Sequence, residues 1–310
     1  MTAVAPPATA LTATTIPLGQ HRRNAAGLAF HVLLLLALLF SLGVLATLVI
    51  SVLIGGLPVL MERGLDFLTS PTSANPNKAG VVQGIIGSLI MTGIVALVAI
   101  PLGIMTAIYL EEYAPASRLS RFIDINIRNL AGVPSIVYGL LGFTVFVTVL
   151  APVTGGTTIL SAGLTLAALV LPIVIIASAE AIRSVPHELR EGGYGIGASR
   201  WQVTRELVLP AAMPGILTGT ILALARAIGE TAPLLLVGAV LGYFSSGSQG
   251  PLEQLFGKFT ALPTLIYDWA RRPQSEFRDL TSAAIIVLLV ITLFATAVSI
   301  YLRNRYQKTW

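Results

Sequence analysis

The sequence of 310 residues contains no cysteine and few charged residues. Without cysteine there is no disulfide framework, thiolate metal site or cysteine nucleophile, and the redox compartment cannot be read from this residue type. The three histidines, His21, His31 and His187, are scattered without the spacing of metal ligands. The pattern G-x-x-x-x-G-K-[ST] is also missing, since Gly257-Lys258 lacks the earlier glycine and the following Ser or Thr. We therefore expect a chain that is not an enzyme, does not hydrolyse ATP itself, and has no metal site or cofactor.

Hydrophobic residues make up 55% of the chain and charged residues only 11%, which is a membrane composition. The net charge of +5 fits either nucleic acid or the cytoplasmic membrane face as a partner. The basic residues flank apolar runs, so we predict contact with membrane lipid and no nucleic-acid partner. Residues 1–25, rich in Ala, Thr and Pro, are predicted to be a disordered cytoplasmic tail. Residues 26–310 form one membrane domain, whose first apolar run is too long for a signal peptide.

Six apolar runs are long enough to cross a bilayer, given about 20 residues for each spanning helix. The runs are approximately 27–54, 83–110, 130–150, 159–179, 215–241 and 281–302. They predict an all-α polytopic membrane protein with six transmembrane helices. The outer loops are expected near 55–82 and 242–280.

The orientation of the spans follows from the distribution of Lys and Arg. Twelve of these residues lie on the side of the amino terminus, against six on the other side. This bias places both termini and the polar segment 180–214 in the cytoplasm.

Residues 180–214 are a charged interruption in an otherwise apolar sequence. Arginines and glutamates alternate there, so the segment is polar and close to neutral. Several glycines indicate a sharp bend between two short helices. The second helix begins with the capping-box spacing of Ser199 and Gln202, and we expect it to end at Pro210 and Pro214.

The fifth apolar run carries two charges, Arg226 and Glu230, near its middle. A charge in hydrocarbon costs about 2.5–3.5 kcal/mol on insertion scales, so both side chains should face protein or water. Their i, i+4 spacing allows them to pair on one helix face. A purely structural ion pair is one interpretation, and a substrate pathway, in which the arginine fork binds an oxyanion such as phosphate, is the favoured one.

Three further features bear on packing. Residues 111–129 alternate apolar and charged residues and predict an amphipathic helix on the inner membrane surface. Tyr267 and Trp269 are predicted to anchor the outer loop at the membrane interface. Gly215 and Gly219 have a small-xxx-small spacing that allows helices to approach closely.

The polar segment resembles the cytoplasmic coupling loop of ABC importer permeases, whose pattern is Glu-Ala-Ala, three residues, Gly, nine residues, Ile-x-Leu-Pro. The matching positions are Glu191, Gly192, Gly193, Gly197 and Leu207 to Pro210, with glycines in place of the alanines and leucine in place of isoleucine. The resemblance implies the type I importer permease fold. It also implies that these residues dock into a groove on a separate ATPase subunit, which binds the ATP.

Residues 101–119, 131–143 and 225–239 are similar to hallmark segments of the permeases of bacterial phosphate ABC importers. The sequence Glu230-Thr231-Ala232-Pro233 is closer to the PstA type than to its PstC-type partner. The resemblance implies an inner-membrane location and a place for Arg226, Glu230 and Thr231 in the phosphate path. It further implies three partners: a PstC-like permease, a PstB-like ATPase dimer and a PstS-like phosphate-binding protein.

Two other classes of function remain open. One is an ion-coupled anion transporter or channel that uses Arg226 and Glu230 without an ATPase. The other is a membrane signalling component whose polar loop binds a kinase. Retention of an ATPase subunit on purification distinguishes both from an ABC importer.

Overall fold

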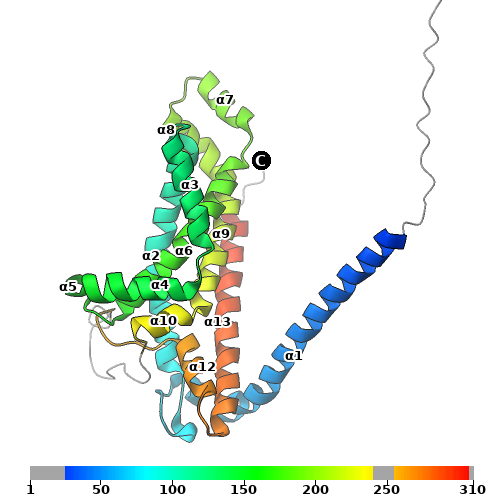
Figure 1. The fold of residues 1–310 in the computed structure, drawn as a ribbon, viewed down its shortest axis with the longest axis vertical. Coiled ribbons are helices and arrows are strands. Elements are labelled where there is room, and N and C mark those ends of the chain that lie inside the picture. Colours follow the sequence, from blue (N-terminus) through cyan, green and yellow to red (C-terminus); the bar gives the residue numbers. More distant parts are fainter. Residues whose placement is uncertain (1–24, 240–254, 307–310) are drawn as a thin grey trace, which may run out of the picture. The chain divides into compact units, whose positions relative to one another are not determined.

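The computed structural model describes residues 25–239 and 255–306, and every regular element in these ranges is a helix (Figure 1). Residues 25–51 and residues 52–306 belong to two units, and each is described by itself. The predicted disordered tail lies outside the described residues except for Ala25, which begins the first helix.

Helix α1 (Ala25–Thr69) is longer than the predicted first span, and its end occupies part of the expected outer loop 55–82. The helix continues past two glycines because they pack against α13: a Cβ on Gly56 would lie 2.7 Å from the backbone nitrogen of Ala283. Tertiary packing of this kind outweighs weak helix propensity. The helical backbone is broken at Gly64, where φ is +48°.

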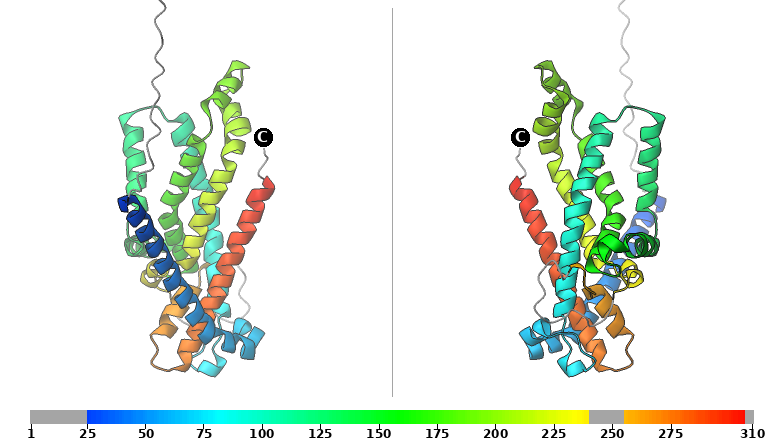
Figure 2. Two further views of the ribbon diagram at one scale, coloured as in Figure 1. Left: turned by 90° about the vertical axis from the view of Figure 1, so that its right-hand side faces the viewer. Right: turned by 90° about the vertical axis from the view of Figure 1, so that its left-hand side faces the viewer.

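Helix α6 (Ile159–Arg183) is the central element of the second unit. It packs along α2 (Val82–Ile108), which continues as the π-helical turn η2 (Tyr109–Tyr113), and along α9 (Leu209–Gly229). Helix α13 (Glu276–Tyr306) packs on α9, so the long helices of this unit lie side by side (Figure 2).

Five helices of the described residues are long and apolar enough to cross a membrane, and the number is six if one sharply bent pair of helices is counted as a single span. The pair consists of α3 (Arg118–Ala131) and the helix 135–149, formed by α4 (Ser135–Gly142) and η3 (Phe143–Val149), with a bend of 103°. A short helix, α5 (Ala151–Thr154), follows. The single span predicted at 130–150 is therefore wrong, because the chain bends sharply between residues 131 and 135.

The bend has a local cause. Pro134 precedes α4, and a proline disfavours the helical conformation of the residue before it. The Tyr138 hydroxyl donates a hydrogen bond of 2.9 Å to the carbonyl of Leu130, which fixes the end of α3 against the start of α4.

Helix α3 is amphipathic, as the sequence predicts, but it contacts the helix bundle. It lies beside α6. Arg128 of α3 forms an ion pair with Asp124 of the same helix at 3.2 Å and another with Glu180 of α6 at 3.6 Å. None of its residues is buried, so α3 rests on the bundle through one side only. Its position on the membrane surface stays a prediction.

The predicted end of the second short helix at Pro210 and Pro214 is wrong. The helix that begins as α8 (Arg200–Val203) and η4 (Thr204–Val208) continues into α9 without interruption. The π turn accommodates the first proline, because the Leu209 N–H bonds to the Thr204 carbonyl and the next nitrogen carries no hydrogen.

A cluster of buried apolar residues packs around helix α12 (Leu262–Ala270). Trp269 is only 1% exposed and lies between the rings of Phe67 and Phe277, at centroid distances of 6.3 and 5.9 Å. The predicted interfacial role is therefore wrong for Trp269, which is a core residue. Tyr267 is 42% exposed, and its role stays a prediction.

Candidate transport and coupling sites

The two charges of the fifth span lie at a break in the helix. Helix α9 ends at Gly229, Glu230 is extended (φ −76°, ψ 128°), and the short helix α10 (Ala232–Val237) follows. Pro233 explains the break, since its ring cannot continue α9 and it has no N–H to bond four residues back. Arg226 is therefore in the last turn of α9, not near the middle of a span from 215 to 241 as predicted.

The predicted ion pair is confirmed. The Arg226 Nε lies 3.1 Å from the Glu230 Oε1, and the side chains are 44% and 16% exposed. Arg226 is thus half-exposed in this chain, whereas Glu230 is mostly buried. Thr231 is half-buried and directly precedes α10. All three residues of the predicted substrate path thus lie at one helix break.

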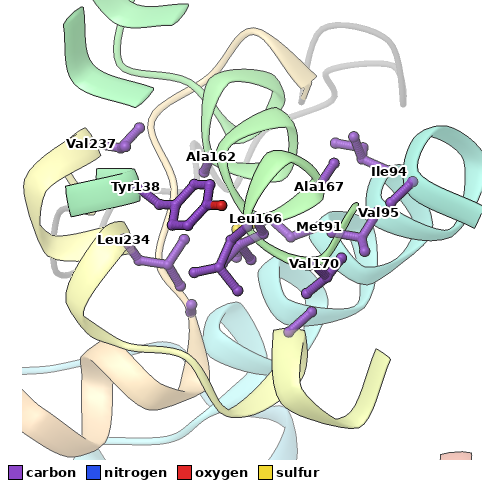
Figure 3. Packing of buried hydrophobic residues seen from close by; sticks show 14 of the residues in the cluster. Met91, Ile94, Val95, Tyr138, Ala162, Leu166, Ala167, Val170, Leu234 and Val237 are labelled. Atoms are coloured by element: carbon purple, nitrogen blue, oxygen red, sulfur yellow. The ribbon is translucent and has the colours of Figure 1, made fainter. Parts of the chain in front are cut away.

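The bend between α3 and α4 lies next to this break. A Cβ on Gly139 of α4 would stand 2.7 Å from the Pro233 Cα of α10, so the two short helices touch at backbone distance. Tyr138 packs with Leu234 and Val237 of α10 and with α6 (Figure 3). Non-helical backbone at membrane depth is tolerated only inside protein or along a water-filled cavity.

The chemistry available at this break is recognition of an anion. The guanidinium of Arg226 carries N–H donors in one plane. Glu230 accepts a hydrogen bond from its Nε–H only. A Cβ on Gly229 would meet no atom within 4 Å, so there is open space beside the pair.

The polar segment contains the short helix α7 (His187–Gly195), a turn, and then α8 and η4, which lead into α9. Gly197 has φ +85°, a left-handed conformation that favours glycine. The predicted capping box is confirmed, because Ser199 and Gln202 bond reciprocally. The bend lies after α7, so most of the glycines thought to form it are helical.

The predicted coupling residues fall into two groups. Glu191, Gly192, Gly197 and Pro210 are exposed, whereas Gly193 is buried and Leu207 is half-buried. A Cβ on Gly193 would lie 2.8 Å from Leu207 Cδ1, so this glycine lets α7 sit tightly on the turn η4. The first group is available to a partner, and the second holds α7 in place.

Exposed apolar side chains accompany the first group. They are Leu189, Tyr194, Ile196 and Trp201. Ile196 is the extreme case at 87% exposure. Exposed apolar side chains on a polar element are typical of surfaces that contact another protein or a membrane.

The sequence analysis missed the partners of the arginines in this segment. Arg183 pairs with Glu111, and Arg190 pairs with Glu112 at 2.8 Å. Both carboxylates belong to η2, at the end of α2. Two consecutive glutamates directly after an apolar span were the available signal, but local alternation of charge suggested that the segment neutralised itself.

The fold and these sites define an importer permease, and the sequence comparison agrees. Residues 99–308 match the family described as binding-protein-dependent transport system inner membrane component. The chain belongs to this family. Membership implies a multi-pass inner-membrane permease that is not a catalytic enzyme and that works with a substrate-binding protein and an ATPase.

Relatives within the family carry more specific names. The chain is 38% identical over 213 residues to the phosphate transport system permease protein PstA 1 of Mycobacterium tuberculosis (strain CDC 1551 / Oshkosh), covering 68% of this chain and 67% of the relative. It is 32% identical over 252 residues to PstA of Haemophilus influenzae, covering 81% and 83%. It is 35% identical over 272 residues to the probable ABC transporter permease protein YqgH of Bacillus subtilis, covering 84% and 86%.

Solved structures confirm the predicted type I importer permease fold. A bacterial alginate ABC transporter in complex with its pentasaccharide-bound periplasmic protein gives a TM-score of 0.67 at 16% identity, over 92% of this chain and 97% of that chain. The MetNI methionine ABC transporter, in an inward-facing conformation, gives 0.60 at 17% identity, over 74% and 96%.

Proposed function

We propose that this chain is a PstA-type permease subunit of an ATP-driven phosphate importer. Its partners in the proposal are a PstC-like permease, a PstB-like ATPase dimer and a PstS-like phosphate-binding protein. The chain needs no metal or cofactor, since the ATPase subunits bind the ATP. It sits in the bacterial inner membrane with both termini in the cytoplasm.

The observation that carries the proposal is the half-exposed Arg226 at the break between α9 and α10. A guanidinium facing lipid would cost several kcal/mol, so this surface of the chain belongs against a second subunit or a polar cavity. Two permeases that meet there would enclose the pathway. Phosphate passing through it meets the donors of Arg226 that Glu230 leaves free.

Glu230 and Thr231 have supporting roles in this pathway. Glu230 holds the guanidinium in one orientation through the Nε contact, and it can accept a hydrogen bond from a protonated phosphate. Thr231 offers a hydroxyl in the extended connection between the two helices.

Coupling to ATP hydrolysis is assigned to the exposed residues of α7 and the turn after it. Glu191, with Gly192 and Gly197, forms the polar part of the docking surface, and the exposed apolar side chains form the remainder. Closure of the ATPase pair would displace α7 and alternate the access of the pathway.

Reconstitution in vesicles tests the transport proposal. The complex should accumulate phosphate only with both ATP and the binding protein present. The Arg226→Gln variant should keep every subunit and lose uptake, because the amide has no charge and lacks the guanidinium fork. Uptake that needed an ion gradient and no ATP would instead support an ion-coupled transporter. Normal uptake by the variant would remove Arg226 from the path.

Co-purification tests the coupling proposal. The wild-type permease should retain the ATPase subunit, and Glu191→Arg should lose it, because the charge on the exposed surface is reversed. A suitable control is Arg118→Glu on α3, an equally exposed charge outside the polar segment. If Glu191→Arg retained the ATPase as well as wild type does, docking through α7 would be disproved.

A further inference from the structure

Three consecutive residues at the end of α2 each bind a different arginine. Glu111 pairs with Arg183 at the end of α6, and Glu112 pairs with Arg190 of α7. The ring of Tyr113 lies 5.2 Å from the guanidinium carbon of Arg200 in α8. The three arginines come from three successive pieces of the polar segment. We call Glu111, Glu112 and Tyr113 the α2 triplet.

The geometry of a helix end explains how one short stretch reaches three partners. Consecutive side chains on a helix point about 100° apart, so neighbours in sequence face different surroundings. The triplet lies in the π turn η2, where the Ala114 N–H bonds to the Tyr109 carbonyl at 2.7 Å. Its side chains therefore spread around the end of α2 toward α6, α7 and α8.

Arg190 and Glu112 form the more buried ion pair, although Glu111 of the other pair is itself only 16% exposed. The side chains of Arg190 and Glu112 are 13% and 5% exposed, whereas Arg183 is 55% exposed. An exposed pair is weak because water screens it, but a buried pair whose partner is removed leaves a charge without compensation. Removing one partner should therefore cost more at Arg190 and Glu112 than at Arg183 and Glu111, although the second pair is joined by two hydrogen bonds.

Arg190 also binds the end of α6. Its Nη1 donates to the Val185 carbonyl at 2.7 Å and its Nη2 to the Ile182 carbonyl at 2.9 Å. Helix ends leave such carbonyls without partners, and a cation there is favourable. One guanidinium from α7 thus joins α2 and α6, which requires the several fixed donors of arginine.

We propose that Glu112 and Arg190 are positioning residues that make α7 move together with α2, so that displacement of α7 reaches the membrane-spanning bundle through this contact. This inference rests on the proposed function, in which an ATPase displaces α7. Two short connections, residues 184–186 and 196–199, also join α7 to its neighbours, and α7 packs on η4 through Gly193, but Glu112 is the partner that links it to the end of α2.

The first experiment compares transport and hydrolysis in vesicles. Wild type, Glu112→Gln, Arg190→Gln and the double variant are reconstituted with the ATPase and the binding protein, and phosphate moved per ATP hydrolysed is measured. We expect each variant that assembles to keep hydrolysing ATP while this ratio falls at least about fivefold. The double variant should be no worse than Arg190→Gln alone, because Arg190→Gln already removes the contact with Glu112 together with the hydrogen bonds to Val185 and Ile182.

Asp124→Asn is the matched control, since it removes a carboxylate from an exposed pair on α3 and should leave the ratio unchanged. A purely structural role would reduce assembly, hydrolysis and transport together at a constant ratio. An unchanged ratio in assembled variants, or losses that multiply in the double variant, would overturn the proposal.

A second measurement keeps the contact intact. The sequence has no cysteine, so spin labels can be placed in pairs, with Glu188→Cys on α7 combined with either Met105→Cys on α2 or Leu293→Cys on α13, all exposed positions. Between the nucleotide-free and ATP-bound complex, the distance from 188 to 105 should stay constant while the distance from 188 to 293 changes. A change between α7 and α2 would refute the link. If wild type moved no phosphate, the proposed function would fail, and these distances would still report on the link.

Discussion

Gly219 of α9 lies against Ala177 of α6 so closely that a Cβ on the glycine would stand 2.2 Å from the alanine Cβ. One turn away, a Cβ on Gly215 would stand 2.7 Å from that of Ala181. The two glycines of the predicted small-xxx-small spacing therefore lie in the contact between α6 and α9, the helices that flank the coupling segment.

Replacing Gly219 with a larger residue should separate α6 from α9. Gly219→Leu places a large side chain where no Cβ fits, and overpacking of this kind costs about 1–3 kcal/mol or more. We expect a lower midpoint of thermal unfolding for the purified complex in detergent. Gly93→Leu on α2 is the control, because a Cβ there meets no atom within 4 Å. Equal stability of the two variants would contradict the close contact.

Neutralising Glu230 should impair transport without dissociating the complex. Glu230→Gln keeps the shape of the side chain but weakens the contact that orients the Arg226 guanidinium. Loss of orientation at a binding site costs about tenfold or more in rate. The measurement is the initial rate of labelled phosphate uptake, normalised to the amount of assembled complex. If the rate matched that of wild type, Glu230 would have no part in the path.

Substitutions of Trp269 and of Tyr267 distinguish a role in core packing from a role in anchoring at the membrane interface. Trp269→Ala removes a fully buried ring next to Phe67 and should cost about 3–5 kcal/mol. Tyr267→Ala removes a half-exposed ring and should cost much less. Chemical unfolding in detergent, followed by circular dichroism, compares the two. A larger loss for Tyr267→Ala would favour interfacial anchoring over packing.

The capping box should control how firmly α8 begins. Ser199→Ala removes the acceptor for the Gln202 N–H, and loss of such a cap costs about 1 kcal/mol. Hydrogen exchange of the Gln202 and Val203 amides, which bond to Ser199, should become several times faster. Ser184→Ala is the control, since that hydroxyl bonds only to the Ala181 carbonyl outside the box. Unchanged exchange in Ser199→Ala would show that the cap contributes nothing.

Local patterns in the sequence predicted the features that depend on near neighbours. The helical class, the amphipathic residues of α3, the capping box and the i, i+4 pair of Arg226 and Glu230 were each predicted correctly. These features depend on helix periodicity and on contacts within a few residues, which the sequence displays directly.

Helix ends were predicted less well, and prolines were the reason. Pro210 was expected to stop a helix that in fact continues, because a π turn before it leaves its missing N–H unneeded. Pro233 was read inside a span, but it ends α9 and begins α10. A proline is compatible with a break, a bend or a continuing helix, and the surrounding packing decides among them.

The sequence by itself determined that this chain is an all-helical membrane protein with one polar segment and one charged pair in a span, because hydrophobicity and spacing are local properties. Only the tertiary structure decided which glutamate binds which arginine and where the two helix breaks meet. Arg190 lies 78 residues from Glu112, and nothing in local charge alternation prefers that partner. Burial at the end of α2 selects it, since a charge removed from water requires a partner in contact.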